Sequence, residues 1–110
     1  MMLVLDQMAQ ECLRNCTECH DTCLQTAVTA DVVEQISADD LRLLLNCAEV
    51  CRTCADFIDT VSAQQRLMCG TCAQICAACE QMCRNSANET MRRCADVCAR
   101  CADSCRRMAA

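Results

Sequence analysis

The chain has 110 residues, of which 54% are hydrophobic and 23% are charged, and its formal net charge is −5. This length suits one compact domain, expected over residues 1–110, and the scarcity of aromatic residues, proline and glycine argues against a β-sandwich or β-barrel. All ten basic residues are arginines scattered along the chain, whereas a nucleic-acid-binding protein would show a concentrated basic face. Nucleic acid is therefore not an expected partner.

Neither a membrane span nor an export signal is predicted. No run of about 18 uninterrupted apolar residues occurs, which argues against a transmembrane helix. Residues 1–10 lack the basic region and the longer apolar region of an export signal. We therefore expect a cytoplasmic location and no membrane partner.

Sixteen cysteines, about 15% of the chain, form four clusters in which the spacing alternates between four and three residues. This average repeat of about 3.5 residues places all cysteines of one cluster on one stripe of an α-helix. In chain order, the clusters are Cys12, Cys16, Cys19 and Cys23; Cys47, Cys51 and Cys54; Cys69, Cys72, Cys76, Cys79 and Cys83; and Cys94, Cys98, Cys101 and Cys105. Four stripes predict four helices whose inward faces are lined with sulfur.

The boundaries of these helices are predicted from residues that commonly cap helix N-termini. These residues are Ser37 with Asp40 for the second helix, Ser62 with Gln65 for the third, and Asn88, or Ser86 with Glu89, for the fourth. The expected helices are residues 3–26, 39–60, 63–85 and 89–108, with an extra helical turn at residues 31–36. Short connections make consecutive helices antiparallel, so the predicted fold is all-α, an up-down-up-down four-helix bundle with a cysteine-lined core.

The thiols themselves indicate metal binding. Disulfide scaffolds are loop-rich secreted domains whose turns use glycine and proline, and this chain has one glycine and no proline. Packing alone is a poor explanation, because a core made only of small cysteine side chains would bury little apolar surface per residue. No inward position between Cys12 and Cys23, or between Cys69 and Cys83, belongs to Leu, Ile or Val.

Thiolate-only sites select Cu(I), Zn(II) or iron–sulfur clusters. One iron–sulfur cluster would use four cysteines and leave the rest unexplained. Four Zn(II) sites would bury a net charge of about −8, whereas Cu(I) at about one ion per cysteine leaves a core of roughly zero charge. Multiple Cu(I) ions are therefore the favoured ligand, while a zinc–thiolate module and an iron–sulfur electron carrier remain alternatives. The single histidine forms no Cys–His–Asp pattern, so an enzyme is not expected.

Four runs carry a resemblance that covers nearly the whole chain. They are CLRNCTECHDTC at residues 12–23, NCAEVC at 46–51, CAQICAAC at 72–79 and CADVCARCADSC at 94–105. In these runs the chain closely resembles the bacterial copper storage proteins, especially their cytosolic branch. The resemblance implies a four-helix bundle that stores many Cu(I) ions on core cysteines, commonly as a homotetramer. Copper donor or acceptor proteins are the partners that this storage role implies.

The chain departs from cytosolic relatives at the mouth of the bundle. Those relatives carry several histidines at the start of the fourth helix, where this chain has Met91 and no histidine. A thioether is also a soft copper ligand, so we expect Met91 to bind copper there. His20, the only histidine, follows Cys19 at the edge of a stripe, and both copper contact and a surface role remain open for it. The predicted metal ligands are the sixteen cysteines, Met91 and His20.

The antiparallel arrangement predicts two different ends of the bundle. One end is expected to be an apolar plug made of Leu5, Met8, Ile58, Val61 and Met108. The other end gathers Cys23, Leu44, Cys83 and Met91, with His20 one turn inside. Because sulfur ligands nearly reach the rim at this second end, we expect copper to enter there.

Overall fold

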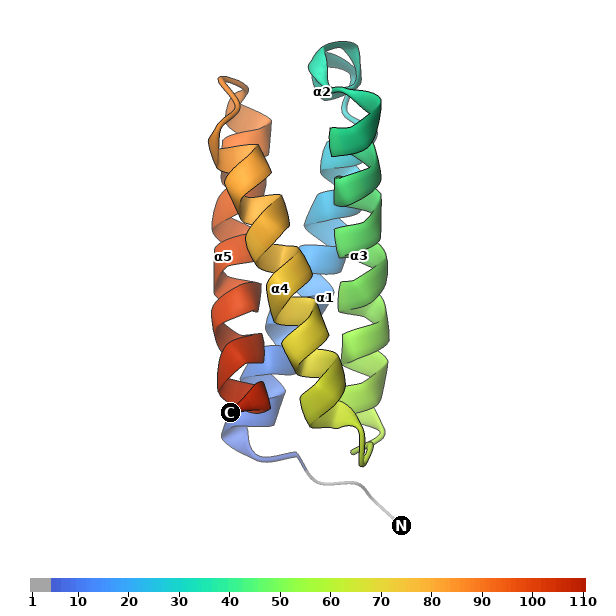
Figure 1. Ribbon diagram of the computed structural model, residues 1–110, viewed down its shortest axis with the longest axis vertical. Coiled ribbons are helices and arrows are strands. Elements are labelled where there is room, and N and C mark those ends of the chain that lie inside the picture. Colours follow the sequence, from blue (N-terminus) through green and yellow to red (C-terminus); the bar gives the residue numbers. More distant parts are fainter. Residues whose placement is uncertain (1–4) are drawn as a thin grey trace.

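The computed structural model describes residues 5–110, and its four long helices form an antiparallel bundle of 48 × 24 × 20 Å (Figure 1). The long helices are α1 (Gln7–Ala27), α3 (Ala38–Asp59), α4 (Gln65–Arg84) and α5 (Glu89–Ala109), and the short helix α2 (Ala30–Gln35) lies between α1 and α3. α1 packs against α3 and α5, and α4 packs against the same two helices. The predicted up-down-up-down four-helix bundle is confirmed, and so is the extra turn before the second long helix.

Three of the helices begin with a side-chain cap. The Asp6 carboxylate accepts a hydrogen bond from the Ala9 N–H at 2.8 Å, and the Ser37 hydroxyl oxygen accepts one from the Asp40 N–H at 3.1 Å. The caps at Ser37 and Asn88 were predicted, whereas the cap at Asp6 was missed. α1 therefore begins at Gln7 rather than at residue 3, although residues 3 and 4 themselves lie outside the described residues.

The capping box predicted at Ser62 and Gln65 is wrong. The Ser62 hydroxyl oxygen accepts a hydrogen bond from the Gln64 N–H at 3.1 Å, so it closes a local turn, and α4 begins two residues later than expected. The preceding connection explains this turn. Val61 has a φ of 51°, and the Ser62 N–H donates to the Phe57 carbonyl at 3.0 Å, which is the pattern that ends α3 with a left-handed residue.

The core of the bundle is built mainly from cysteine and alanine. All sixteen cysteines are fully buried, and the largest other side chains with no exposure are Leu44, Ile58 and Val32. Leu44 and Ile58 lie toward opposite ends of α3, and Val32 comes from α2. The two large side chains of α3 therefore lie beyond its cysteines, one on each side.

The predicted apolar plug is only partly correct. Ile58 is buried and Leu5 and Met108 pack against the core, but Met8 and Val61 are 49% and 50% exposed. Continuing the alternation of three and four residues backward from Cys12 leads to Ala9 and Leu5, so Met8 falls off the stripe. Val61 lies beyond the end of α3, where the helical spacing no longer applies.

The outer surface carries ion pairs between exposed side chains. Two of them join residues four apart on one helix, Arg84 with Glu80 and Arg107 with Asp103. Arg84 also reaches Asp96 of α5 at 2.7 Å, and two further pairs join α5 to α1. Such exposed pairs contribute at most about 1 kcal/mol each, so packing rather than charge holds the helices together. Within the described residues, no helix combines the length and hydropathy needed to cross a bilayer.

Candidate metal site

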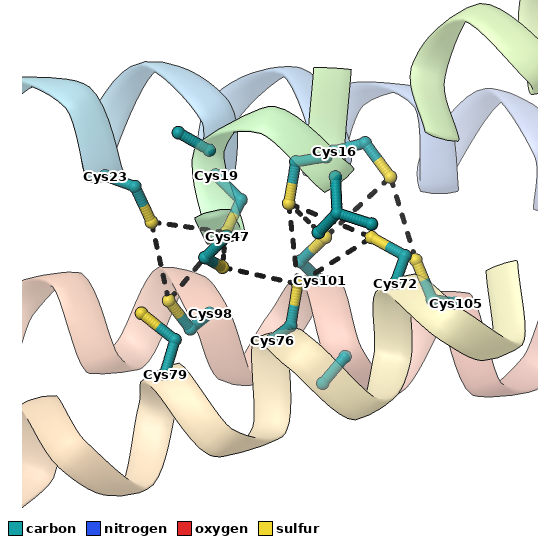
Figure 2. Packing of buried hydrophobic residues seen from close by; sticks show 14 of the residues in the cluster. Cys16, Cys19, Cys23, Cys47, Cys72, Cys76, Cys79, Cys98, Cys101 and Cys105 are labelled. Atoms are coloured by element: carbon teal, nitrogen blue, oxygen red, sulfur yellow. Dashed lines mark hydrogen bonds between the residues drawn. The ribbon is translucent and has the colours of Figure 1, made fainter. Parts of the chain in front are cut away.

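The four cysteine stripes meet in one column of sulfur atoms along the bundle axis. Figure 2 shows sulfur atoms from α1, α3, α4 and α5 pointing toward one another in the interior. The sulfur of Cys51 lies 3.4 Å from that of Cys76, and many other neighbouring sulfur atoms are separated by 3.6–4.0 Å. All sixteen are free thiols in one buried cluster. The helical spacing thus brings every predicted cysteine into the same core.

Eleven of the cysteines form four overlapping groups of four. Within each group, all sulfur atoms lie within 4.8 Å of one another. The groups are Cys16, Cys54, Cys72 and Cys105; Cys51, Cys72, Cys76 and Cys101; Cys19, Cys47, Cys51 and Cys76; and Cys19, Cys23, Cys47 and Cys98. Because the groups share members, their thiols make a continuous chain of ligands rather than four separate sites.

The other five cysteines extend this chain toward both ends of the bundle. At one end, the Cys12 sulfur is 3.7 Å from that of Cys105, and the Cys69 sulfur is 3.6 Å from that of Cys54. At the other end, the Cys94 sulfur is 3.8 Å from that of Cys23. Cys79 and Cys83 complete the column on α4. A soft monovalent ion that bridges two or three thiolates finds such neighbours along nearly the whole length.

Neighbouring thiols shift one another's acidity. Hydrogen bonding with Cys23, and to a smaller degree with Cys83 and Cys98, lowers the pKa of Cys79 to about 6, although Cys47 and burial oppose this change. The pKa of Cys83 is raised well above its ordinary value, because hydrogen bonds with Cys79 and Cys94 hold its proton and because burial disfavours the thiolate. Neighbouring thiols of the column therefore differ in how readily they lose their protons.

Thiolates formed in this column would have no buried cationic side chain beside them among residues 5–110. In the described part of the chain, the buried polar side chains are Thr26, Asn88 and Ser104, and none of them is cationic. A metal-filled core must therefore approach neutrality through the charge of its own ions, because unbalanced buried charge is costly.

Met91 lies at the end of the column where α1 and α4 end. It is 5% exposed, and it lies three residues before Cys94 on α5. Met91 lines a hollow of about 220 Å³ together with Met82, Asp40 and four other residues. Met82, which also lines this hollow, is not among the ligands predicted from the sequence. Its position next to Cys83 in the last turn of α4 is the only indication in the sequence.

His20 lies at the seam between α1 and α3 and is half-buried. Its Nδ1 is 2.7 Å from the Ala48 carbonyl oxygen, so the Nδ1–H donates to that oxygen. This hydrogen bond leaves Nε2 as the nitrogen with a free lone pair. None of the four sulfur groups in the described residues includes His20.

A helical bundle whose interior is a continuous column of free thiols defines a cysteine-rich protein suited to many soft metal ions. The model of the copper storage protein family matches residues 3–110, and the chain belongs to this family. Comparison with curated proteins finds no match.

Solved structures share both the fold and part of the sequence. The protein Nmul_A1745 from Nitrosospira multiformis is 38% identical, with a TM-score of 0.87 over 94% of this chain and 96% of that one. The metal-free copper storage protein 3 from Bacillus subtilis is 30% identical, with a TM-score of 0.85 over 93% of this chain and 99% of that one. The Cu(I)-bound copper storage protein BsCsp3 is 29% identical, with a TM-score of 0.85 over 94% of this chain and all of that one.

Proposed function

We propose that this protein stores Cu(I) in the cytoplasm on its core thiolates, at about one ion per cysteine. The observation that carries this proposal is the continuous column of sixteen buried thiols from four helices. Membership of the copper storage protein family and similarity to a Cu(I)-bound relative support the choice of metal. A reducing cytoplasm keeps such thiols available for metal.

The balance of charge favours Cu(I) over Zn(II). One Cu(I) per thiolate makes the core about neutral, whereas each Zn(II) held by four thiolates leaves a net charge of about −2. The zinc–thiolate module is the second candidate, because the four groups of four thiols have spacings suitable for a tetrahedral ion. Its buried charge would stand without a cationic side chain beside it, which makes a zinc-filled core the more costly one.

Copper enters the column beside Met91. Met91, Met82 and Asp40 line one hollow at this end, and Cys94 follows about one turn further along α5. A Cu(I) ion passes from Met91 to the thiols of Cys94 and Cys23, which are in mutual contact at 3.8 Å. His20 has only Nε2 to offer a copper ion, because Nδ1 donates to the Ala48 carbonyl.

The protein acts by binding rather than by catalysis. The clustered reactive groups of the described residues are thiols closed off from solvent, and the chain's single histidine is held by a backbone carbonyl. Copper ions are the ligand, copper donor or acceptor proteins are the partners, and a homotetramer is the expected assembly.

Anaerobic titration of the reduced, metal-free protein with Cu(I) in the presence of a competing chelator tests the stoichiometry. We expect about sixteen tightly bound ions per chain, one for each cysteine. The same protein with its cysteines alkylated after unfolding is the control and should bind no copper. Saturation at four or fewer ions, or an iron chromophore in the purified protein, would contradict the proposal.

A further inference from the structure

The short helix α2 stands at the same end of the bundle as Met91. In Figure 1 it lies above the junction of α1 and α3, opposite the connection between α4 and α5. Val32 of α2 is fully buried and belongs to the same buried cluster as Cys23, Cys83 and Cys94. Val32 therefore anchors α2 in the core at this end, and α2 packs against α1.

One hydrogen bond ties α2 to the other side of the bundle. The Asn88 Nδ2 donates to the Asp31 Oδ2 at 2.9 Å, across 57 residues of sequence. The same Asn88 side chain caps α5, because its Oδ1 accepts from the Met91 N–H at 3.0 Å. Asn88 is only 8% exposed, so this amide is held between α2 and the first turn of α5. We call the Asp31–Asn88 hydrogen bond the α2 latch.

One hollow lies at each end of α2. The hollow beside Met91 is lined partly by Gln35 and Ile36, at the C-terminal end of α2. A second hollow, of about 200 Å³, is lined by Thr29, which precedes α2, together with Thr26, Thr90, Arg93 and two further residues. Asp31, the latch residue on α2, lies in the sequence between Thr29 of one hollow and Gln35 of the other.

A metal ion needs a movement at this end. Cys23, Cys83 and Cys94 have no exposed surface, so an ion in either hollow does not meet them directly. α2 is the helix with the least local support, because it has six residues, one buried side chain and no side-chain N-cap bond. A helix this short has little stability of its own and depends on its tertiary contacts.

We propose that Asp31 is a positioning residue that holds α2, through the α2 latch, against the end of the bundle that contains Cys23, Cys83 and Cys94. Release of the latch sets the rate at which these three upper thiols react with an incoming ligand. For copper this inference rests on the proposed storage function. Its effect on thiol access does not, because a small thiol reagent reports the opening of α2 without any metal.

Three variants separate the latch from its surroundings. Asp31→Ala removes the acceptor, while Asp31→Asn keeps a carbonyl oxygen that accepts from Asn88. Glu34→Ala is the matched control, because Glu34 is an exposed acidic residue on the same short helix. Asp31 is preferred to Asn88 as the altered residue, because a change at Asn88 would also remove the cap of α5.

The first measurement uses the reduced, metal-free protein and no copper. A brief pulse of iodoacetamide, followed by peptide mass spectrometry, gives the labelling rate of each cysteine. In Asp31→Ala we expect Cys23, Cys83 and Cys94 to react about fivefold faster, the change that loss of one hydrogen bond produces in a local opening equilibrium. Cys12 and Cys105, at the far end, should keep their rates, and Asp31→Asn and Glu34→Ala should behave as the parent protein does.

The second measurement follows Cu(I) transfer from a coloured chelator to the same variants. We expect Asp31→Ala to load about fivefold faster with unchanged final capacity. Parent-like labelling of the upper cysteines in Asp31→Ala, or equal acceleration at Cys12 and Cys105, would overturn the latch. If the parent protein binds no Cu(I) while the labelling result holds, the storage function fails and the latch stands.

Discussion

Replacing Cys19 by serine is expected to halve the capacity for Zn(II) while lowering the capacity for Cu(I) by only about one ion. Cys19 belongs to two of the four sulfur groups, and the two remaining groups both contain Cys72. In the parent protein two groups that share no thiol can be filled at once, so about two Zn(II) ions bind. In Cys19→Ser the two surviving groups compete for Cys72, and about one Zn(II) ion binds.

Because Cys19 and Cys72 are shared among the four groups, a double variant and a control can also be designed. Cys19→Ser combined with Cys72→Ser leaves none of the four groups complete, so tight Zn(II) binding should be lost. Cys69→Ser is the matched control, because Cys69 is buried in the same column but belongs to none of these groups. It should keep about two Zn(II) ions and lose about one Cu(I) ion.

Anaerobic titration of each reduced variant, followed by gel filtration and metal analysis, measures both capacities. Tetrahedral Zn–S bonds of about 2.3 Å require sulfur atoms about 3.8 Å apart, close to the spacings of the metal-free column. The Zn(II) capacity should therefore depend on the number of intact four-thiol groups, whereas the Cu(I) capacity should depend on the number of thiols. If Cys19→Ser and Cys69→Ser lose the same amount of Zn(II), or if Cu(I) capacity falls with the number of intact groups, the reasoning from bridging thiolates is refuted.

Three further outcomes follow from the same structure. Met91→Leu should slow Cu(I) loading with little change in capacity, and adding Cys23→Ser and Cys83→Ser should slow it further; stopped-flow transfer from a chelator measures both rates. Lowering the pH should weaken the affinity for Cu(I) in competition titrations, because thiols with a raised pKa, such as Cys83, must lose a proton to bind. The affinity should fall by up to about tenfold per pH unit for an ion that displaces one proton. Val61→Gly should stabilise the metal-free protein by about 1 kcal/mol in chemical denaturation followed by circular dichroism, because Val61 is half-exposed and has a left-handed φ that glycine adopts freely.

The spacing of the cysteines was sufficient to predict the bundle and its sulfur core. An alternation of four and three residues has one helical interpretation, and burial of all sixteen thiols confirms it. The caps at Ser37 and Asn88 were also predictable, because short polar side chains before a periodic segment commonly accept the first free N–H groups. These predictions depend on neighbours within a few residues of sequence.

The errors and omissions depend on contacts between distant segments or on competing local turns. Ser62 closes a turn instead of capping α4, because the left-handed Val61 ends α3 first. The hydrogen bond from Asn88 to Asp31 joins residues 57 positions apart, and no spacing rule predicts it. Met82 lies beside the hollow at Met91 only because α4 and α5 are antiparallel neighbours.

We expect this core to fold without metal, because large apolar side chains are buried beyond the cysteines of α3. Protonated cysteines pack as small hydrophobic residues, so the column itself contributes burial to the metal-free bundle. Leu44 and Ile58 are fully buried toward the two ends of α3, and each contributes more burial than any one thiol does. A zinc-dependent module unfolds when its ion leaves, because the ion supplies most of its folding energy. Here Leu44 and Ile58 are buried without being metal ligands, so we expect the bundle to stay folded when copper leaves the column.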